Sequence, residues 1–182
     1  MHYAKINKYD VANGPGVRVS LFVSGCRNCC KGCFNTQLWD FNFGNEFTDK
    51  TSVEILASLK PNYIAGLSIL GGEPMEPENQ QELLPFIKWI HKKAPNKTIW
   101  IYTGYTIEEL LGNKIIPNVT LPILECTNVL VDGRFEESLK DISLVFRGSS
   151  NQRIIDVQWT LNNYRHAKYK TPIAVVEVGK MK

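Results

Sequence analysis

Hydrophobic and polar residues follow two different periods along the chain, which separate expected strands from expected helices. Apolar residues alternate with polar ones over 17–23, and this period of two predicts a strand. Further apolar runs predict strands over 64–70, 97–102 and 128–131, and we expect additional ones around 143–147 and 173–178. Apolar residues at helical spacing predict helices over 51–59, from Pro77 up to Pro95, and over 106–112.

Because strands and helices alternate, we predict an α/β fold with mostly parallel strands and helical crossovers. The chain has 182 residues, whereas a closed eight-fold β/α barrel typically needs about 250. One domain is therefore expected, with a boundary near 148–151 and a tail behind it.

Composition narrows the class of protein. Hydrophobic residues make up 43% of the chain, aromatic residues 10% and charged residues 21%, which is ordinary for a globular domain. No run approaches the roughly 20 apolar residues that span a bilayer, so no membrane partner is expected. The net charge of +3 is too small to indicate a nucleic-acid partner, and the basic excess lies in 151–182. Residues 1–8 contain no apolar run typical of a secretory signal, and we expect a cytoplasmic, reducing location.

The most informative segment holds four of the five cysteines within eight residues, at Cys26, Cys29, Cys30 and Cys33. Disulfides are rare in reducing compartments, and the neighbours Cys29 and Cys30 would close a strained ring. Zinc knuckles are normally separated by a long spacer, and here the spacer is zero. Covalent haem needs Cys-x-x-Cys-His, which this segment does not contain. The spacing favours an iron–sulfur cluster over these alternatives.

Three thiolates on one short loop can hold three irons of a four-iron cluster and leave the fourth iron open for a bound molecule. The spacing leaves two ligand sets open, Cys26/Cys30/Cys33 and Cys26/Cys29/Cys33. The fifth cysteine, Cys126, lies on or near the strand expected over 128–131, and we interpret it as a small buried hydrophobe.

Further motifs follow the cysteines in a fixed order. The run Cys26-x3-Cys30-x2-Cys33, followed by Gly71-Gly72-Glu73-Pro74, resembles the radical S-adenosylmethionine (SAM) superfamily. Within it, the chain resembles the activating proteins of anaerobic ribonucleoside-triphosphate reductases. The segments that carry this resemblance are 13–16 (NGPG), 21–26 (LFVSGC), 32–35 (GCFN), 102–105 (YTGY), 131–135 (VDGRF) and 147–152 (RGSSNQ).

The resemblance covers residues 1–153 and implies a radical SAM domain there, folded as a partial, open β/α barrel. Residues 154–182 are expected to form a basic C-terminal extension of the same domain. The resemblance implies a [4Fe–4S] cluster on Cys26, Cys30 and Cys33, with Cys29 as a bystander. It also implies SAM contacts at Gly32, Cys33, Phe34, Gly71, Gly72 and Glu73, where a Gly-Gly turn lets backbone carbonyls come close to the ligand.

The reaction implied by the resemblance begins with one electron from a reduced donor such as flavodoxin. Reductive cleavage of SAM then gives a 5′-deoxyadenosyl radical, which takes a hydrogen from a glycine of the large reductase subunit. Two alternatives stay open: activation of another glycyl-radical enzyme such as pyruvate formate-lyase, and an iron–sulfur or zinc module without catalysis.

Five further positions carry weaker expectations. Thr103 is expected to face SAM or simply to end a strand. Asp132 and Arg134 are expected to contact the ribose or the partner's loop, with a surface ion pair as the plainer interpretation. Arg147 and Arg153 are candidates for contact with the partner protein.

Overall fold

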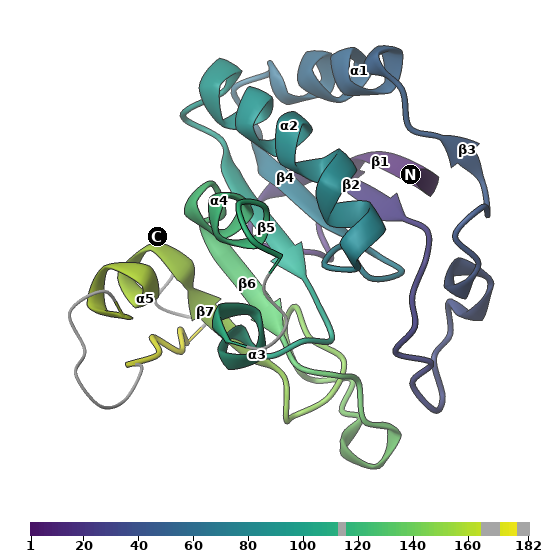
Figure 1. Cartoon of the computed structure of the whole chain (residues 1–182), viewed down its shortest axis with the longest axis vertical. Helices are drawn as coiled ribbons and strands as arrows, with labels where there is room; N and C mark the ends of the chain where they lie inside the picture. Colours follow the sequence, from purple (N-terminus) through teal and green to yellow (C-terminus); the bar gives the residue numbers. More distant parts are fainter. Residues whose placement is uncertain (113–115, 165–171, 178–182) are drawn as a thin grey trace.

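The computed structural model describes residues 1–112, 116–164 and 172–177. Its centre is one open seven-stranded sheet in the order β3-β1-β2-β4-β5-β6-β7 (Figure 1). The strands are β1 (His2–Asp10), β2 (Val17–Val23), β3 (Asn45–Glu46), β4 (Ile64–Gly71), β5 (Thr98–Tyr102), β6 (Val129–Asp132) and β7 (Arg153–Asp156).

Strand direction differs between the middle and the edges of the sheet. The four central strands β2, β4, β5 and β6 run parallel. The pairs β1–β2, β1–β3 and β6–β7 are antiparallel. The prediction of an open α/β fold is confirmed. The prediction of mostly parallel strands holds only for the centre. Antiparallel strands that the sequence pattern did not indicate flank it, with β3 and β1 at one edge and β7 at the other.

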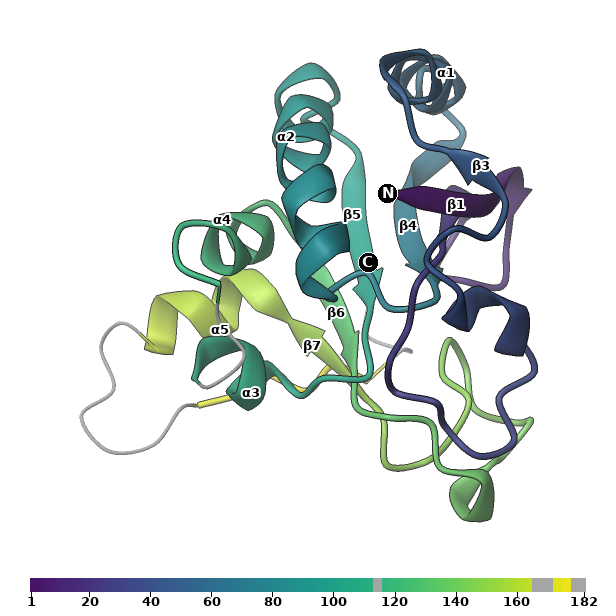
Figure 2. The same cartoon turned by 45° about the vertical axis from the view of Figure 1, so that its right-hand side comes forward.

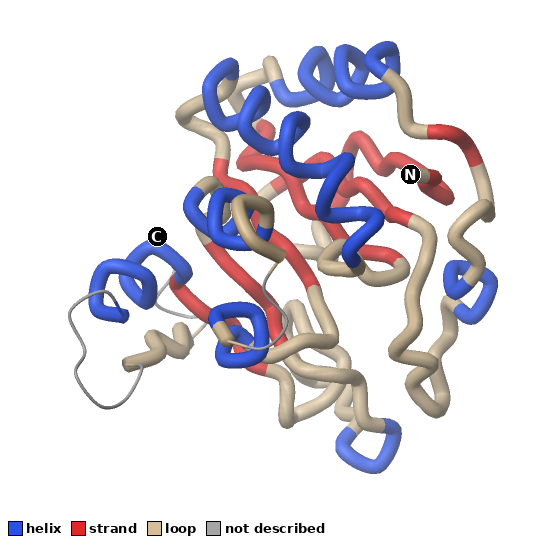
Figure 3. Tube along the Cα trace, viewed as in Figure 1, coloured by secondary structure: helices blue, strands red, loops and turns tan. Residues whose placement is uncertain are grey.

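The helices α1 (Asp49–Leu59), α2 (Pro77–Lys93), α4 (Thr120–Glu125) and α5 (Val157–Tyr164) pack onto one face of the sheet. Figures 2 and 3 show α1, α2 and α4 on this face. A short helix, α3 (Ile107–Leu111), follows β5, and the two 3₁₀ turns are η1 (Thr36–Trp39) and η2 (Glu137–Leu139). No helix in the described ranges is long and apolar enough to cross a membrane.

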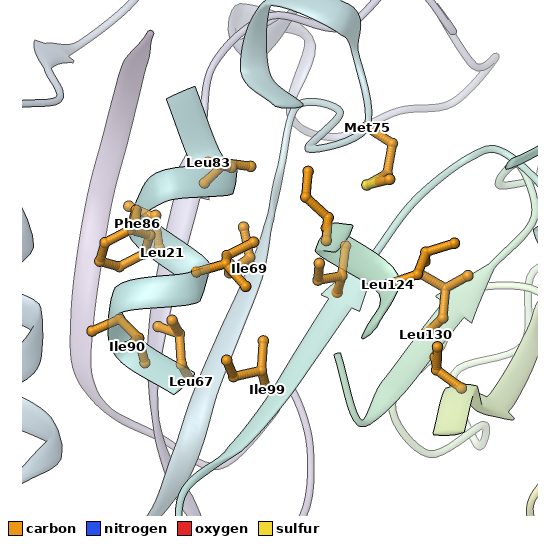
Figure 4. Close-up of a cluster of buried hydrophobic side chains, with 14 of the residues drawn as sticks. Leu21, Leu67, Ile69, Met75, Leu83, Phe86, Ile90, Ile99, Leu124 and Leu130 are labelled. Carbon is orange, nitrogen blue, oxygen red and sulfur yellow. The ribbon is translucent and has the colours of Figure 1, made fainter. Parts of the chain in front are cut away.

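The main core fills the space between this helical layer and the sheet (Figure 4). Alternate residues of the central strands point into it, which explains the period of two in the sequence. Side chains from α2 cover the middle strands, and those of α4 lie beside β6. The residues labelled in Figure 4 are Leu21, Leu67, Ile69, Met75, Leu83, Phe86, Ile90, Ile99, Leu124 and Leu130, and all are buried.

The helices that form the main core lie on one face of the sheet. The opposite face is also buried. A second apolar cluster of Trp100, Val131 and Ile154 lies there, with Phe146 edge-on to Trp100 at 5.6 Å between ring centroids. Arg18 is fully buried on this face. Its guanidinium donates to the side chains of neighbouring strands and to two backbone carbonyls.

The sequence located the central elements within one or two residues and misplaced the last strands. No strand forms over 143–147, where the chain instead belongs to the long β6–β7 connection. The final strand of the sheet is β7, and Ile155, Val157 and Leu161 belong to the main core. Of the strand expected over 173–178, residue 178 lies outside the described residues, and the described part forms a single bridge between Val175 and Ile155.

Candidate functional site

A cavity of about 400 Å³ opens at the carboxyl ends of the four parallel strands. Parallel strands place their carboxyl ends at the same edge, where open α/β sheets bind ligands. The loop after β2 brings the cysteines to this edge, the turn after β4 brings Gly71 to Glu73, and β5 ends in Tyr102. The β6–β7 connection, residues 133–152, supplies the remaining wall, and it lies beside the cysteine loop in Figures 1 and 2.

Three of the clustered cysteines line this cavity, and the fourth does not. Cys26, Cys30 and Cys33 are half-buried lining residues. Cys29 is exposed, lies outside the lining and has a positive φ of 46°. The loop therefore turns at Cys29, and Cys26 and Cys30 face the same cavity. Spacing alone left Cys29 and Cys30 as equal candidates, and the two differ in placement because only Cys30 lines the cavity.

The environment of Cys26 and Cys30 raises the pKa of both thiols and so favours their protonated form. Burial raises the pKa of the Cys26 thiol to about 11. Burial also raises the pKa of Cys30, against a hydrogen bond from the backbone N–H of Phe135. A metal that binds these thiols must displace their protons, which makes loading favourable at higher pH.

The donor set fits a cluster better than a single ion. Within the described residues, no three His, Cys, Asp or Glu side chains gather closely enough to hold one metal ion. A tetrahedral zinc site needs its ligands around one point, whereas a four-iron cluster takes thiolates on separate irons. Three cysteines that line one cavity match the requirement of a four-iron cluster.

The Gly71–Gly72 turn packs directly on the base of the cysteine loop. Gly71 has a φ of 116°, and the backbone N–H of Gly72 donates to the Val23 carbonyl at 2.7 Å. A Cβ on Gly72 would lie 2.6 Å from the carbonyl oxygen of Gly25. Both glycines line the cavity. Glycine is required here because the cysteine loop lies against the turn, a reason the sequence did not reveal.

Glu73 joins three loops at the cavity. Its buried carboxylate accepts hydrogen bonds from the backbone N–H groups of Met75 and Gly104, from the Thr103 hydroxyl and from the Asn28 amide, all at 2.7–2.8 Å. Burial raises its pKa to about 7, in opposition to these four donors. These four contacts hold the turn after β4 in its orientation at the cavity.

Gly32 and Phe34 flank Cys33 and differ in placement. Phe34 lines the cavity mouth and is 89% exposed. Gly32 is not among the lining residues; it has a φ of 73°, and a Cβ there would lie 2.7 Å from the Glu137 carboxylate. Gly32 thus lets the cysteine loop contact the β6–β7 connection.

Several cavity residues were missed or given little weight by the sequence pattern. Tyr102 lines the cavity, and its buried hydroxyl has no hydrogen-bond partner among the residues that the structure describes. Phe146 and Arg147 line it from the β6–β7 connection. Tyr102 and Arg147 lie in segments that carry the resemblance, whereas Phe146 had no signal in a single sequence.

Asp132 and Arg153 form an ion pair, and neither residue is among those that line the cavity. Asp132 is fully buried at the end of β6 and accepts from the Arg153 guanidinium and from the Ile107 backbone N–H. The ion-pair interpretation of Asp132 was correct in kind, but its partner is Arg153, and the carboxylate is not at the surface.

These features define an iron–sulfur domain with a single cysteine loop, and residues 12–155 match the family described as "4Fe-4S single cluster domain". Proteins named anaerobic ribonucleoside-triphosphate reductase-activating protein are similar to the chain over most of its length. The one from Pasteurella multocida is 42% identical over 156 residues, which cover 85% of this chain and 96% of the relative. The relative from Escherichia coli K12 is 40% identical over 154 residues, 84% of this chain and 96% of its own. The relative from Enterobacteria phage T4 is 38% identical over 154 residues, 85% and 93% of the two chains. The chain belongs to the family of anaerobic ribonucleoside-triphosphate reductase-activating proteins.

Proposed function

We propose that this chain is a radical SAM activase that generates a glycyl radical on the large subunit of an anaerobic ribonucleoside-triphosphate reductase. The observation that carries the proposal is the convergence of Cys26, Cys30 and Cys33 on one cavity at the carboxyl ends of the parallel strands. The open sheet then corresponds to a partial β/α barrel, and residues 1–153 to its catalytic domain.

The three cysteines would hold a [4Fe–4S] cluster, and the cavity beside them would hold SAM. When bound, the cluster supplies the electron that cleaves the sulfonium of SAM to methionine and a 5′-deoxyadenosyl radical, which takes a hydrogen atom from a glycine of the reductase. An external reductant such as flavodoxin would provide that electron. The chain itself contributes binding, orientation and exclusion of water.

Two features of the cavity support a bound polar molecule. Its volume of about 400 Å³ is in the range of small-molecule sites. No described residue forms a hydrogen bond with the buried Tyr102 hydroxyl, and a buried polar group without a hydrogen bond costs free energy that a ligand can recover. Glu73 keeps the turn beside the cysteines in place through its four hydrogen bonds.

The β6–β7 connection would exclude water from the radical. Phe135, Leu144 and Phe146 line the cavity from this connection, and apolar side chains near a radical offer no exchangeable proton and little room for solvent. The exposed ring of Phe34 at the mouth places the opening next to the cysteine loop. A glycine loop of the partner would enter there.

The choice of the reductase as partner rests on the relatives, which carry its name. The decisive experiment mixes the anaerobically reconstituted chain, a reductant, SAM and the reductase, and records an electron paramagnetic resonance spectrum. We expect a glycyl radical on the reductase. Its absence, with a fully loaded cluster, would refute the function. A radical that forms instead on pyruvate formate-lyase would replace the partner and keep the chemistry.

Matched cysteine variants test the ligand set in the same preparation. Cys30→Ala is expected to lose the cluster absorption and all SAM cleavage, because its thiol lines the cavity. Cys29→Ala is expected to keep about four irons per chain and most of the activity, because its thiol lies outside. The reverse result would contradict the ligand assignment.

A further inference from the structure

The two residues between Cys26 and Cys29 point in different directions: Arg27 reaches the N-terminal end of α2, whereas Asn28 lines the cavity. Arg27 donates its backbone N–H to one oxygen of Glu76 and its guanidinium to the other, both at 2.8 Å. The guanidinium also lies 4.3 Å from the centroid of the Phe41 ring and forms a second ion pair with Glu78.

The next residue, Asn28, contacts the turn that follows β4. Its amide donates to Glu73 at 2.8 Å. The contact with Gly104 is so close that a Cβ there would lie 2.4 Å from the Asn28 amide nitrogen. Asn28 therefore occupies a slot between the turn after β4 and the end of β5, and glycine at 104 keeps this slot open.

These contacts are strong because their acceptors are buried. Only 2% of the Glu76 side chain is exposed, and Glu73 is fully enclosed. Hydrogen bonds to carboxylates withdrawn from water contribute more than those at the surface. Glu78 is 52% exposed, so its pair with Arg27 contributes little.

We propose that Arg27 and Asn28 are positioning residues that hold Cys26 and Cys30 at the cavity before any cluster is present. This inference rests on the ligand set proposed above. A short loop of irregular structure loses conformational freedom when three thiols converge on one cluster. Contacts that order the loop in the metal-free chain remove that cost from cluster binding, which is preorganisation.

The metal-free chain carries its own reporters for a test by thiol alkylation. Cys26 and Cys30 report on the loop that Arg27 and Asn28 are proposed to hold. The exposed Cys29 sets the reference rate. Cys126, at the C-terminal end of α4, reports on opening of the whole chain. Iodoacetamide is added at one pH, and the rate at each cysteine is read by peptide mass spectrometry.

Two variants release the loop at different contacts. Arg27→Gln removes the guanidinium but keeps the backbone hydrogen bond to Glu76, and Asn28→Ala removes the amide that contacts Glu73. In each variant we expect alkylation of Cys26 and Cys30, relative to Cys29, to rise about tenfold, which is the change in local opening that loss of one hydrogen bond to a charged group produces.

Two matched controls stay in the same region. Lys31→Gln removes a loop cation that is 91% exposed and lies 3.5 Å from Glu137. Glu78→Gln removes only the exposed partner of Arg27. Both are expected to keep the relative rates of the parent chain.

Three outcomes are decisive. A rise confined to Cys26 and Cys30 supports the proposal. Unchanged relative rates in both variants overturn it, because the loop would then be held by other contacts. A parallel rise at Cys126 also overturns it, because the two residues would then stabilise the whole chain rather than position the loop.

Cluster uptake provides a second measurement. With limiting iron and sulfide under anaerobic conditions, the Arg27→Gln and Asn28→Ala variants should take up the cluster several-fold more slowly than Lys31→Gln. The increase in visible absorption measures this uptake. Neither measurement uses SAM or the reductase, so their failure would leave the proposed activity standing. Absence of a glycyl radical would in turn leave the proposed positioning role of Arg27 and Asn28 unaffected.

Discussion

Replacement of Tyr102 by phenylalanine should strengthen the metal-free fold and weaken ligand binding. The hydroxyl is buried at the cavity wall and, within the described ranges of the chain, has no hydrogen-bond partner. Burial raises the pKa of Tyr102, so the hydroxyl is neutral and its proton is available to a ligand. Tyr102→Phe removes only this oxygen and keeps the ring.

The magnitude follows from the state of the hydroxyl with and without a ligand. An unsatisfied buried polar group costs about 1–3 kcal/mol, so Tyr102→Phe should raise the free energy of unfolding of the metal-free chain by about 1 kcal/mol. A ligand that satisfies the hydroxyl gains about the same amount from it. Loss of about 1 kcal/mol corresponds to a dissociation constant roughly fivefold higher for SAM.

Urea denaturation of the metal-free chain measures the first effect, and anaerobic calorimetry of SAM with the loaded chain measures the second. Tyr63→Phe is the matched control, because Tyr63 is 61% exposed and should change neither quantity. A variant that is destabilised would show that the hydroxyl already has a partner. A variant with unchanged SAM affinity would show that the ligand does not reach this wall.

Two further predictions concern buried carboxylates. Asp132→Ala should lower the free energy of unfolding by about 3 kcal/mol, measured by urea denaturation, because Arg153 and the Ile107 N–H both lose a buried acceptor; a change below about 1 kcal/mol would contradict this. Burial raises the pKa of Glu73 to about 7 from the usual 4.5. The folded state therefore binds this proton more tightly, and Glu73 should lower the stability of the metal-free chain as pH rises from about 4.5 to 7, with no further change above. Glu73→Gln should flatten this part of the stability curve, and an unchanged slope would show that Glu73 does not cause it.

The central strands were predictable because burial on one face leaves a direct mark on the sequence. Val19 and Leu21 alternate with Arg18 and Ser20, which reads as a strand with one apolar face. The sequence did not reveal that the polar face is buried as well. Arg18 is covered there because its donors find acceptors on neighbouring strands, a compensation that only the three-dimensional arrangement supplies.

The edge strands were not predictable for a related reason. Strand β1 has one buried residue among nine, the polar Asp10, so its pattern lacks a clear apolar period. Strand β7 has four residues, and its partner β6 lies 20 residues earlier in the chain. Short or exposed strands are specified by pairing more than by their own residues.

The candidate site was predictable where chemistry required particular residues, as for the cysteines and the Gly71–Gly72 turn. The contacts that hold the site together were not predictable. Asn28 within the cysteine loop contacts Glu73, and the backbone of Phe135 contacts Cys30, so both contacts join segments far apart in sequence. One sequence carries no record of such pairs, because amide and aromatic side chains are common in every loop.

The cavity draws its wall from residue 12 to residue 152, and this spread has a consequence for synthesis. The cysteine loop leaves the ribosome first, whereas Phe135 follows roughly 100 residues later. At about 5–20 residues per second, the thiols wait on the order of 10 seconds for that support. During this interval they are unsheltered nucleophiles on an unfinished chain. Anaerobic conditions during synthesis therefore protect these thiols until Phe135 is available to cover them.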